Sequence, residues 1–245
     1  MLGIITRPVR SLLNTFGYEV MKIQTPLTHT TTGNWISKLN IGTIIDIGSN
    51  EGQFIGQINQ VIPGKKIIAF EPIKQCFEKL VVNTKNLNVL AFNCGLSDLN
   101  GTTEINISQN FVSSSILPMA KLHKNLYPES NYVNTQIIEL KRLDDAIKDV
   151  TLRDNILIKM DVQGYENKVI AGGEETIKKA AILIVESSFQ PIYEGQWLFE
   201  DLFQYFISKG FKFVGFTEQI NSKQTGIPVY ADSIFIKADL VKAAF

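Results

Sequence analysis

The sequence predicts a doubly wound α/β domain built on a mostly parallel sheet, and three apolar segments support this prediction. Residues 43–47, 66–70 and 156–160 each have the pattern of a short buried strand that ends in or beside an acidic residue. A glycine-containing turn follows the first and the third strand, and apolar residues then recur at helical spacing. A buried strand that leads into a glycine loop and a helix N-terminus is where open α/β sheets bind nucleotides.

The rest of the chain continues the alternation of strands and helices that such a sheet requires. Further strands are predicted at 88–93, 103–107, 137–140, 181–186, 211–216 and 231–236, and further helices after Pro72, at 143–147 and at 197–206.

No repeat or linker divides the chain, so we expect one domain over residues 1–245. Its Rossmann-like core should occupy residues 43–237, after an N-terminal helical extension at 1–40. Residues 109–135 show no clear period, and long irregular excursions in compact domains are usually functional. We therefore expect 109–135 to form a lid that carries contacts to the substrate.

The topology also predicts which acids meet. Right-handed crossovers place the strand at 156–160 beside the strand at 43–47. Asp46 and Asp161 should therefore face one crevice, and Glu186, which follows the next strand, should lie beside Asp161. Three carboxylates around one crevice are hard to explain by packing, because acids are rarely buried without partners.

The first glycine loop favours S-adenosylmethionine over a dinucleotide. A dinucleotide fingerprint has three glycines, whereas this loop has Gly48 and Gly52. Asp46 stands beside the loop, where a carboxylate repels a pyrophosphate but can hold an ammonium group. Glu71, after the second strand, has the position of a carboxylate that binds ribose hydroxyls. The alternative is a plain strand–loop–helix turn with two incidental acids.

We expect the methyl-donor site to combine these acids with their neighbours. The loop residues should surround the amino-acid end of the donor, and Ser97 and Asp98 should approach the adenine. The full predicted set is Asp46, Gly48, Ser49, Asn50, Gly52, Gln53, Phe54, Glu71, Pro72, Ser97 and Asp98.

Methyl transfer to a hydroxyl requires alignment of the acceptor with the methyl carbon, and a base assists by removing the hydroxyl proton. Asp161 is the first candidate base, Glu186 the second and His123, with an ordinary pKa of about 6.5, the third. The alternative role is a helix N-cap for Asp161, a contact with the helix dipole for Glu166, and exposure in a polar loop for His123. Asp161 and Glu186 could instead hold Mg²⁺, although the favoured mechanism uses no metal.

Composition argues against other classes of protein. The 24 basic and 24 acidic side chains cancel, which argues against bulk attraction to nucleic acid. No apolar run reaches the ~20 residues of a membrane span. Cys76 and Cys94 form no CxxC pattern, so we expect reduced thiols in a cytoplasmic protein. Residues 2–16 could form a basic amphipathic helix, which we expect on the sheet edge or in a homodimer contact rather than on a membrane surface.

Several segments together resemble the FkbM family of methyltransferases. They are Asp46–Phe54, Phe70–Pro72, Leu96–Asp98, Ile158–Glu166 and Ala231–Phe235, and the similarity spans residues 43–237. The Lys-x-Asp-x-x-Gly-x-Glu pattern that begins at Lys159 is the most specific of them.

The resemblance implies a class I Rossmann-like fold, with a seven-stranded sheet whose last strand is antiparallel. It also implies S-adenosylmethionine as methyl donor and O-methylation of a small molecule or glycan, often a sugar or a secondary metabolite. It does not identify the acceptor. The alternatives are a Mg²⁺-assisted O-methyltransferase of a diol, a cofactor-binding partner protein without turnover, and an NAD-dependent oxidoreductase.

Overall fold

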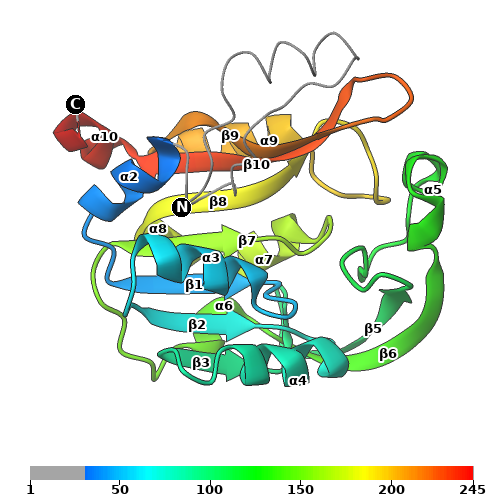
Figure 1. Cartoon of the computed structure of the whole chain (residues 1–245), viewed down its shortest axis with the longest axis horizontal. Helices are drawn as coiled ribbons and strands as arrows, with labels where there is room; N and C mark the ends of the chain where they lie inside the picture. Colours follow the sequence, from blue (N-terminus) through cyan, green and yellow to red (C-terminus); the bar gives the residue numbers. More distant parts are fainter. Residues whose placement is uncertain (1–30, 245) are drawn as a thin grey trace, which may run out of the picture.

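A sheet of seven strands forms the centre of the protein (Figure 1). The computed structural model describes residues 31–244. In spatial order the strands are β3 (Val89–Phe92), β2 (Lys66–Phe70), β1 (Thr43–Ile47), β7 (Ile156–Met160), β8 (Ala180–Ser188), β10 (Pro228–Lys237) and β9 (Phe211–Asn221). Strands β3 to β8 in this order run parallel, and β10 is antiparallel to both of its neighbours. The predicted mostly parallel seven-stranded sheet with an antiparallel last strand is confirmed.

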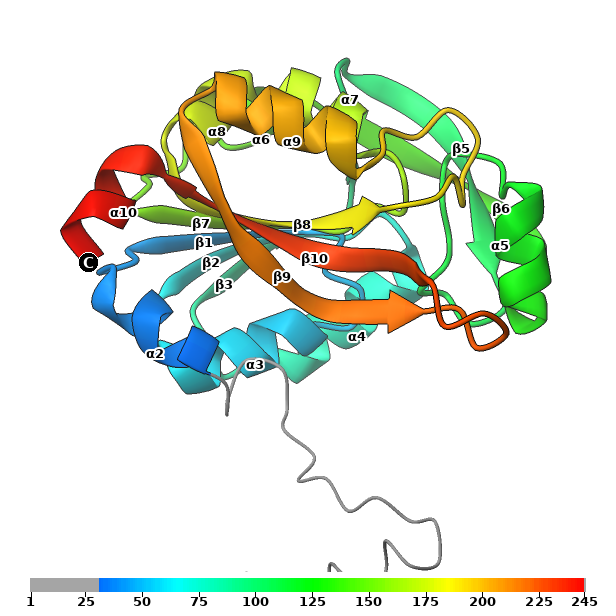
Figure 2. The same ribbon diagram turned by 90° about the horizontal axis from the view of Figure 1, so that it is seen from above.

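Helices cover both faces of this sheet (Figure 2). One face carries α2 (Thr31–Lys38), α3 (Gln53–Val61) and α4 (Lys74–Asn83), and the other carries α6 (Leu143–Ala146), α7 (Glu166–Gly172), α8 (Glu174–Lys178) and α9 (Phe199–Ser208). α10 (Ala238–Ala244) follows β10 at the end of the sheet where the parallel strands begin.

The central strands contribute to both cores because strand side chains alternate between the faces. In β1, Ile45 packs in the cluster that contains Val169 of α7, whereas Ile44 packs in the cluster that contains Ile55 of α3. All five residues of β1 are consequently buried. Burial on both faces explains why the parallel strands appear in the sequence as continuous apolar runs.

A second sheet of three strands lies beyond the carboxyl ends of the parallel strands (Figure 1). Its order is β4 (Gly95–Leu96), β6 (Tyr132–Lys141) and β5 (Gly101–Ser108). The strands predicted at 103–107 and 137–140 are thus present, and they pair with each other in this second sheet.

The segment 109–135 is more ordered than its sequence indicated. It contains α5 (Lys121–Leu126), the 3₁₀ turn η1 (Pro128–Ser130) and the beginning of β6. Met119, just before α5, is buried in a cluster with Ile192, Tyr193 and Val229. Contacts with residues so distant in the chain support this segment, which is why it shows no local period.

The predicted helix at 2–16, and all of the 1–40 extension before Thr31, lie outside the described residues. Within residues 31–244 no helix has the length and apolar character needed to cross a membrane.

Candidate active site

A cavity of about 440 Å³ lies at the carboxyl ends of β1, β2, β7 and β8. This volume falls in the range of small-molecule binding sites. Strands β1 and β7 are paired in register, so the residues that follow them meet at one edge of the sheet. Asp46, Glu71, Asp161 and Glu186 all line the cavity, as the topology predicted.

Gly48 allows the loop after β1 to meet the loop after β7. Its φ is +81°, and a Cβ at this position would lie 1.8 Å from the carbonyl oxygen of Asp161. The amide of Asp161 donates to the carbonyl oxygen of Ile47 at 3.0 Å. Only glycine fits this close approach, so Gly48 joins the two halves of the site in addition to opening the loop toward a ligand.

Asp46 is a buried carboxyl with an unused oxygen. Its side chain is 1% exposed, and within residues 31–244 its Oδ2 has no hydrogen-bonding partner. Burial raises the pKa of Asp46 to about 7. A buried polar atom without a partner is costly, so a ligand that donates a hydrogen bond or carries positive charge would be stabilised here.

Glu71 is held in place by loop amides. Its Oε2 accepts from the amide of Asn50 and its Oε1 accepts from the amide of Ile73, each at 2.8 Å. Burial raises the pKa of Glu71 to about 7, although the two amides act in the opposite direction. Each carboxylate oxygen keeps a second lone pair, which is the arrangement needed to accept from two neighbouring hydroxyls.

Most of the predicted donor-site residues line this cavity: Asp46, Gly48, Ser49, Asn50, Gln53, Phe54, Glu71 and Pro72. Gly52 does not line it. Its φ is +90°, and a Cβ there would approach Leu80 and Thr84 at the end of α4. Gly52 therefore serves the packing of the loop against α4.

Ser97 and Asp98 do not line the cavity, although Oγ of Ser97 lies 3.3 Å from the hydroxyl of Tyr165, which does. The predicted adenine contact is therefore not supported. Ser97 is buried and donates to Asp98, whose carboxylate forms an ion pair with Lys168 at 2.7 Å. The chain enters the second sheet at β4, and both residues follow directly after that strand. The residues just before them, Cys94 to Leu96, line the cavity instead.

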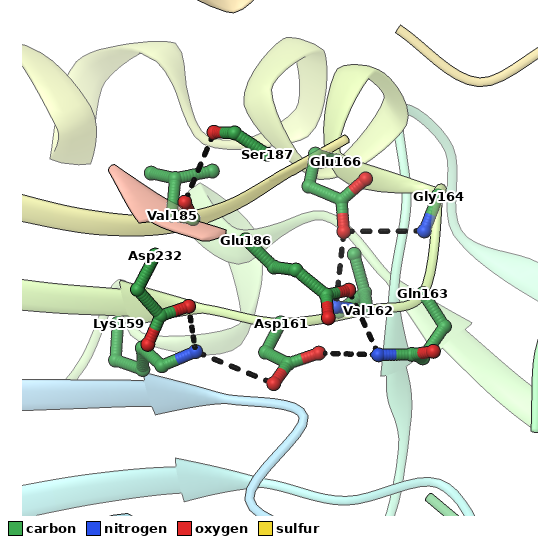
Figure 3. A network of polar contacts seen from close by, with 10 residues as sticks. All are labelled: Lys159, Asp161, Val162, Gln163, Gly164, Glu166, Val185, Glu186, Ser187 and Asp232. Carbon is green, nitrogen blue, oxygen red and sulfur yellow. Dashed lines mark hydrogen bonds and ion pairs between the residues drawn. The ribbon is translucent and has the colours of Figure 1, made fainter. Parts of the chain in front are cut away.

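Gln163 connects the two candidate bases (Figure 3). Its Nε2 donates to Oδ1 of Asp161 and to Oε2 of Glu186, both at 2.8 Å. Its Oε1 accepts from the hydroxyl of Tyr193 at 2.7 Å. These contacts determine the orientation of the amide, because the reversed amide would set its oxygen against two carboxylates. Gln163 also adopts φ +55°, a left-handed conformation that is uncommon for residues other than glycine.

Lys159 lies on the other side of Asp161 (Figure 3). Its Nζ is 3.3 Å from Oδ2 of Asp161 and 3.2 Å from Oδ1 of Asp232 in β10. Burial alone lowers the pKa of a lysine, but the carboxylates of Asp161, Asp232 and Glu186 outweigh it and hold the pKa of Lys159 above its ordinary value. Lys159 therefore stays charged and orients Asp161 toward the cavity.

Glu186 is in a different electrostatic environment from Asp161. Burial, followed by the charges of Asp161 and Glu166, raises the pKa of Glu186 well above its ordinary value. Asp161 is 36% exposed in its side chain and stands between an ammonium and an amide N–H. The raised pKa of Glu186 favours its protonated form, which cannot accept a further proton. Asp161 is therefore the better placed of the two to receive a proton from a ligand.

Of the alternative roles for the acids after β7, the one for Asp161 is wrong, whereas Glu166 lies in the first turn of α7 as its alternative role requires. Helix α7 begins at Glu166 with Tyr165 as its N-cap, so the predicted alternative of Asp161 as a helix cap is wrong. Glu166 is 3% exposed, and its Oε1 accepts from the amides of Val162 and Gly164 at 3.2 Å. Glu166 therefore stabilises the turn that presents Asp161 and Gln163.

His123 does not reach the cavity. It lies in α5 and is 3% exposed, which corrects both the predicted catalytic role and the alternative of an exposed loop residue. Its Nε2 lies 2.9 Å from Oγ of Ser130, and its ring is 5.1 Å from the ring of Tyr193. Burial lowers the pKa of His123. The histidine packs α5 against the chain after β8.

The sequence assigned no role to four residues of this network: Lys159, Gln163, Tyr193 and Asp232. Lys159 and Asp232 are 73 residues apart, and Gln163 and Tyr193 are 30 apart. Lys159 and Asp232 offered a signal, since a charge inside an apolar strand needs a buried partner, and Gln163 and Tyr193 offered none.

The geometry does not support the predicted Mg²⁺ alternative. Nε2 of Gln163 stands between Asp161 and Glu186, and Nζ of Lys159 stands between Asp161 and Asp232. Nitrogen donors thus occupy the positions where a cation would bridge the carboxylates. Within the described part of the chain, no group of three or more His, Cys, Asp or Glu side chains could hold a metal ion.

Comparison with known proteins adds independent findings. The model of the methyltransferase FkbM domain matches residues 46–213. The chain is 32% identical over 160 residues to the 2-O-methyltransferase NoeI of Sinorhizobium fredii. This match covers 62% of this chain and 66% of that protein. It is also 29% identical over 174 residues to the methyltransferase sdnD of Sordaria araneosa, in a match that covers 60% of this chain and 66% of that protein. The chain thus spans slightly less than two thirds of the length of these curated relatives.

Among solved structures, the fibrillarin of Aeropyrum pernix in complex with S-adenosyl-L-methionine matches with a TM-score of 0.45 and 8% identity, over 80% of this chain and 67% of that one.

Proposed function

Because the chain belongs to the FkbM family of S-adenosylmethionine-dependent methyltransferases, we propose that it methylates a hydroxyl oxygen of a sugar, a glycan or a secondary metabolite. The observation that carries the proposal is the division of one cavity between two sets of carboxyl groups. Asp46 and Glu71 follow β1 and β2, and Asp161 and Glu186 follow β7 and β8.

The first set suits the methyl donor. Asp46 offers a buried oxygen without a partner in the described chain, which suits the ammonium group of an amino-acid end. Glu71 is held by two amides with lone pairs to spare, which suits the ribose hydroxyls. S-adenosylmethionine, when bound, supplies a methyl group that its sulfonium already activates. The chain then has to align the acceptor and exclude water.

The second set suits the acceptor. Asp161 is oriented by Lys159 and Gln163 and can take the hydroxyl proton while the oxygen forms its bond to the methyl carbon. With S-adenosylmethionine bound, the bond between that carbon and sulfur would break, and the products would be a methyl ether and S-adenosylhomocysteine. The name of NoeI, a 2-O-methyltransferase, supports an oxygen acceptor. We also propose a cytoplasmic location, which the free thiols of Cys76 and Cys94 support.

The test uses the whole chain in two steps. Calorimetry should first show binding of S-adenosylmethionine and of S-adenosylhomocysteine. Methyl-labelled donor should then label the oxygen of a sugar or metabolite hydroxyl, with the position of the methyl group read by mass spectrometry and NMR. No donor binding, or label found on nitrogen or carbon, would overturn the proposal.

A further inference from the structure

The cavity wall carries many carboxyl groups and few cations. Of the described residues that line the cavity, Lys159 is the single cation, and no arginine or histidine is among them. The carboxyl groups on the wall belong to Asp46, Glu71, Asp161, Glu186, Glu218 and Asp232.

The one cation is already engaged. Nζ of Lys159 is 3.3 Å from Asp161 and 3.2 Å from Asp232. An anionic group that approached Lys159 would have to displace one of these carboxylates and leave it without a partner. Removal of one partner from a buried ion pair is strongly unfavourable.

The loop amides, which often bind anions at the start of a helix, are engaged as well. The amide of Asn50, before α3, donates to Glu71. The amides of Val162 and Gly164, before α7, donate to Glu166. Internal carboxylates thus occupy three of the loop amides to which a phosphate could bind.

The wall resists additional negative charge. Burial first, and then the neighbouring carboxylates, raise the pKa of Glu186 well above its ordinary value. Burial and the charge of Asp161 act in the same direction on Asp232, although Lys159 opposes them. An anionic group of the acceptor beside Glu186 or Asp232 would add to the same repulsion. Hydroxyl and ammonium groups, in contrast, donate to carboxylates.

We propose that the acceptor is a polyhydroxyl compound that is neutral or cationic within the cavity, and that compounds carrying a carboxylate, phosphate or sulfate there are excluded. This inference rests on the proposed function, because it concerns the acceptor of the same methyl transfer. Asp161, Glu186, Glu218 and Asp232 bind its hydroxyl or ammonium groups.

The test compares three matched series of acceptors with the whole chain and S-adenosylmethionine: methyl glycosides, the corresponding uronic acids, and the corresponding amino sugars. Release of S-adenosylhomocysteine gives kcat/KM for each compound. We expect turnover of neutral or amino compounds, and at least a 100-fold lower kcat/KM for a uronic acid than for its neutral counterpart. A uronic acid turned over as well as its neutral counterpart would overturn the inference, and so would the absence of turnover in all three series.

A charge reversal on the cavity wall makes the test specific. In Glu218→Lys we expect the ratio of neutral to anionic kcat/KM to fall about tenfold, because one repulsive charge becomes attractive. The matched control is Glu78→Lys on the exposed side of α4, which should leave the ratio unchanged. Equal ratios in the two variants would count against the electrostatic origin. Binding of S-adenosylmethionine is measured separately. If the donor binds but the preference for neutral acceptors is absent, this inference fails and the proposed function stands. If the donor does not bind, the proposed function itself fails.

Discussion

Replacement of Asp161 by asparagine tests the proposed base most directly. The two side chains have the same shape, so the fold should be retained. Asp161 accepts from Nζ of Lys159 through one oxygen and from Nε2 of Gln163 through the other. Asparagine has one acceptor oxygen, so its amide nitrogen must face one of these two donors.

The expected change in rate follows from the loss of the base, and the expected change in stability follows from the loss of its contacts. Removal of the base should lower the rate of methyl transfer by about 10²–10⁴, which corresponds to ~2.7–5.4 kcal/mol of transition-state stabilisation. Lys159 keeps Asp232 as its partner, and the Asp161 side chain is partly exposed, so the free energy of unfolding should fall by only about 1–2 kcal/mol. Donor affinity should change much less than the rate.

The assay is single-turnover methyl transfer under saturating donor, combined with calorimetry of donor binding and thermal unfolding. Asp149→Asn is the matched control, because Asp149 is exposed and lies outside the cavity. A rate for Asp161→Asn close to that of the control would refute the role of Asp161 as base. Activity restored by excess Mg²⁺ would instead indicate a metal site and contradict the assignment of nitrogen donors to the bridging positions.

Three further predictions concern the donor site and its cover. Glu71→Gln should weaken binding of S-adenosylmethionine by about 1.5–3 kcal/mol in calorimetry, whereas Glu78→Gln should not, and equal affinities would remove Glu71 from the site. Burial raises the pKa of Asp46 to about 7. Between pH ~4 and ~7 the folded protein therefore holds a proton on Asp46 that the unfolded chain releases. The contribution of Asp46 to the free energy of unfolding consequently falls as pH rises through that window. Affinity for the cationic donor should rise over the same window, and a pH dependence identical in Asp46→Asn would contradict this account. Residues 111–116 line the cavity, so S-adenosylhomocysteine together with an acceptor should slow proteolysis within 109–132; equal cleavage rates would argue against a lid.

The sequence alone determined the framework of the site, because the framework depends on local patterns. An apolar run followed by a glycine turn and a helical period identifies a parallel strand and its loop, as at Asp46 and Gly48. The handedness of the crossovers then brings Asp161 next to that loop, and Glu186 next to Asp161. Glu71 could be predicted because its position after the second strand follows from the same topology.

Tertiary structure alone decided which side chains complete the site. Lys159 acquires a role through Asp232, which lies 73 residues later and reaches it because β10 returns antiparallel beside β8. Gln163 is oriented by Tyr193, which arrives from the chain after β8. His123 is buried against Tyr193 rather than exposed. Local periodicity reports which face of an element is apolar, but pairing between distant polar groups depends on how the elements pack, and no local pattern in the sequence records it.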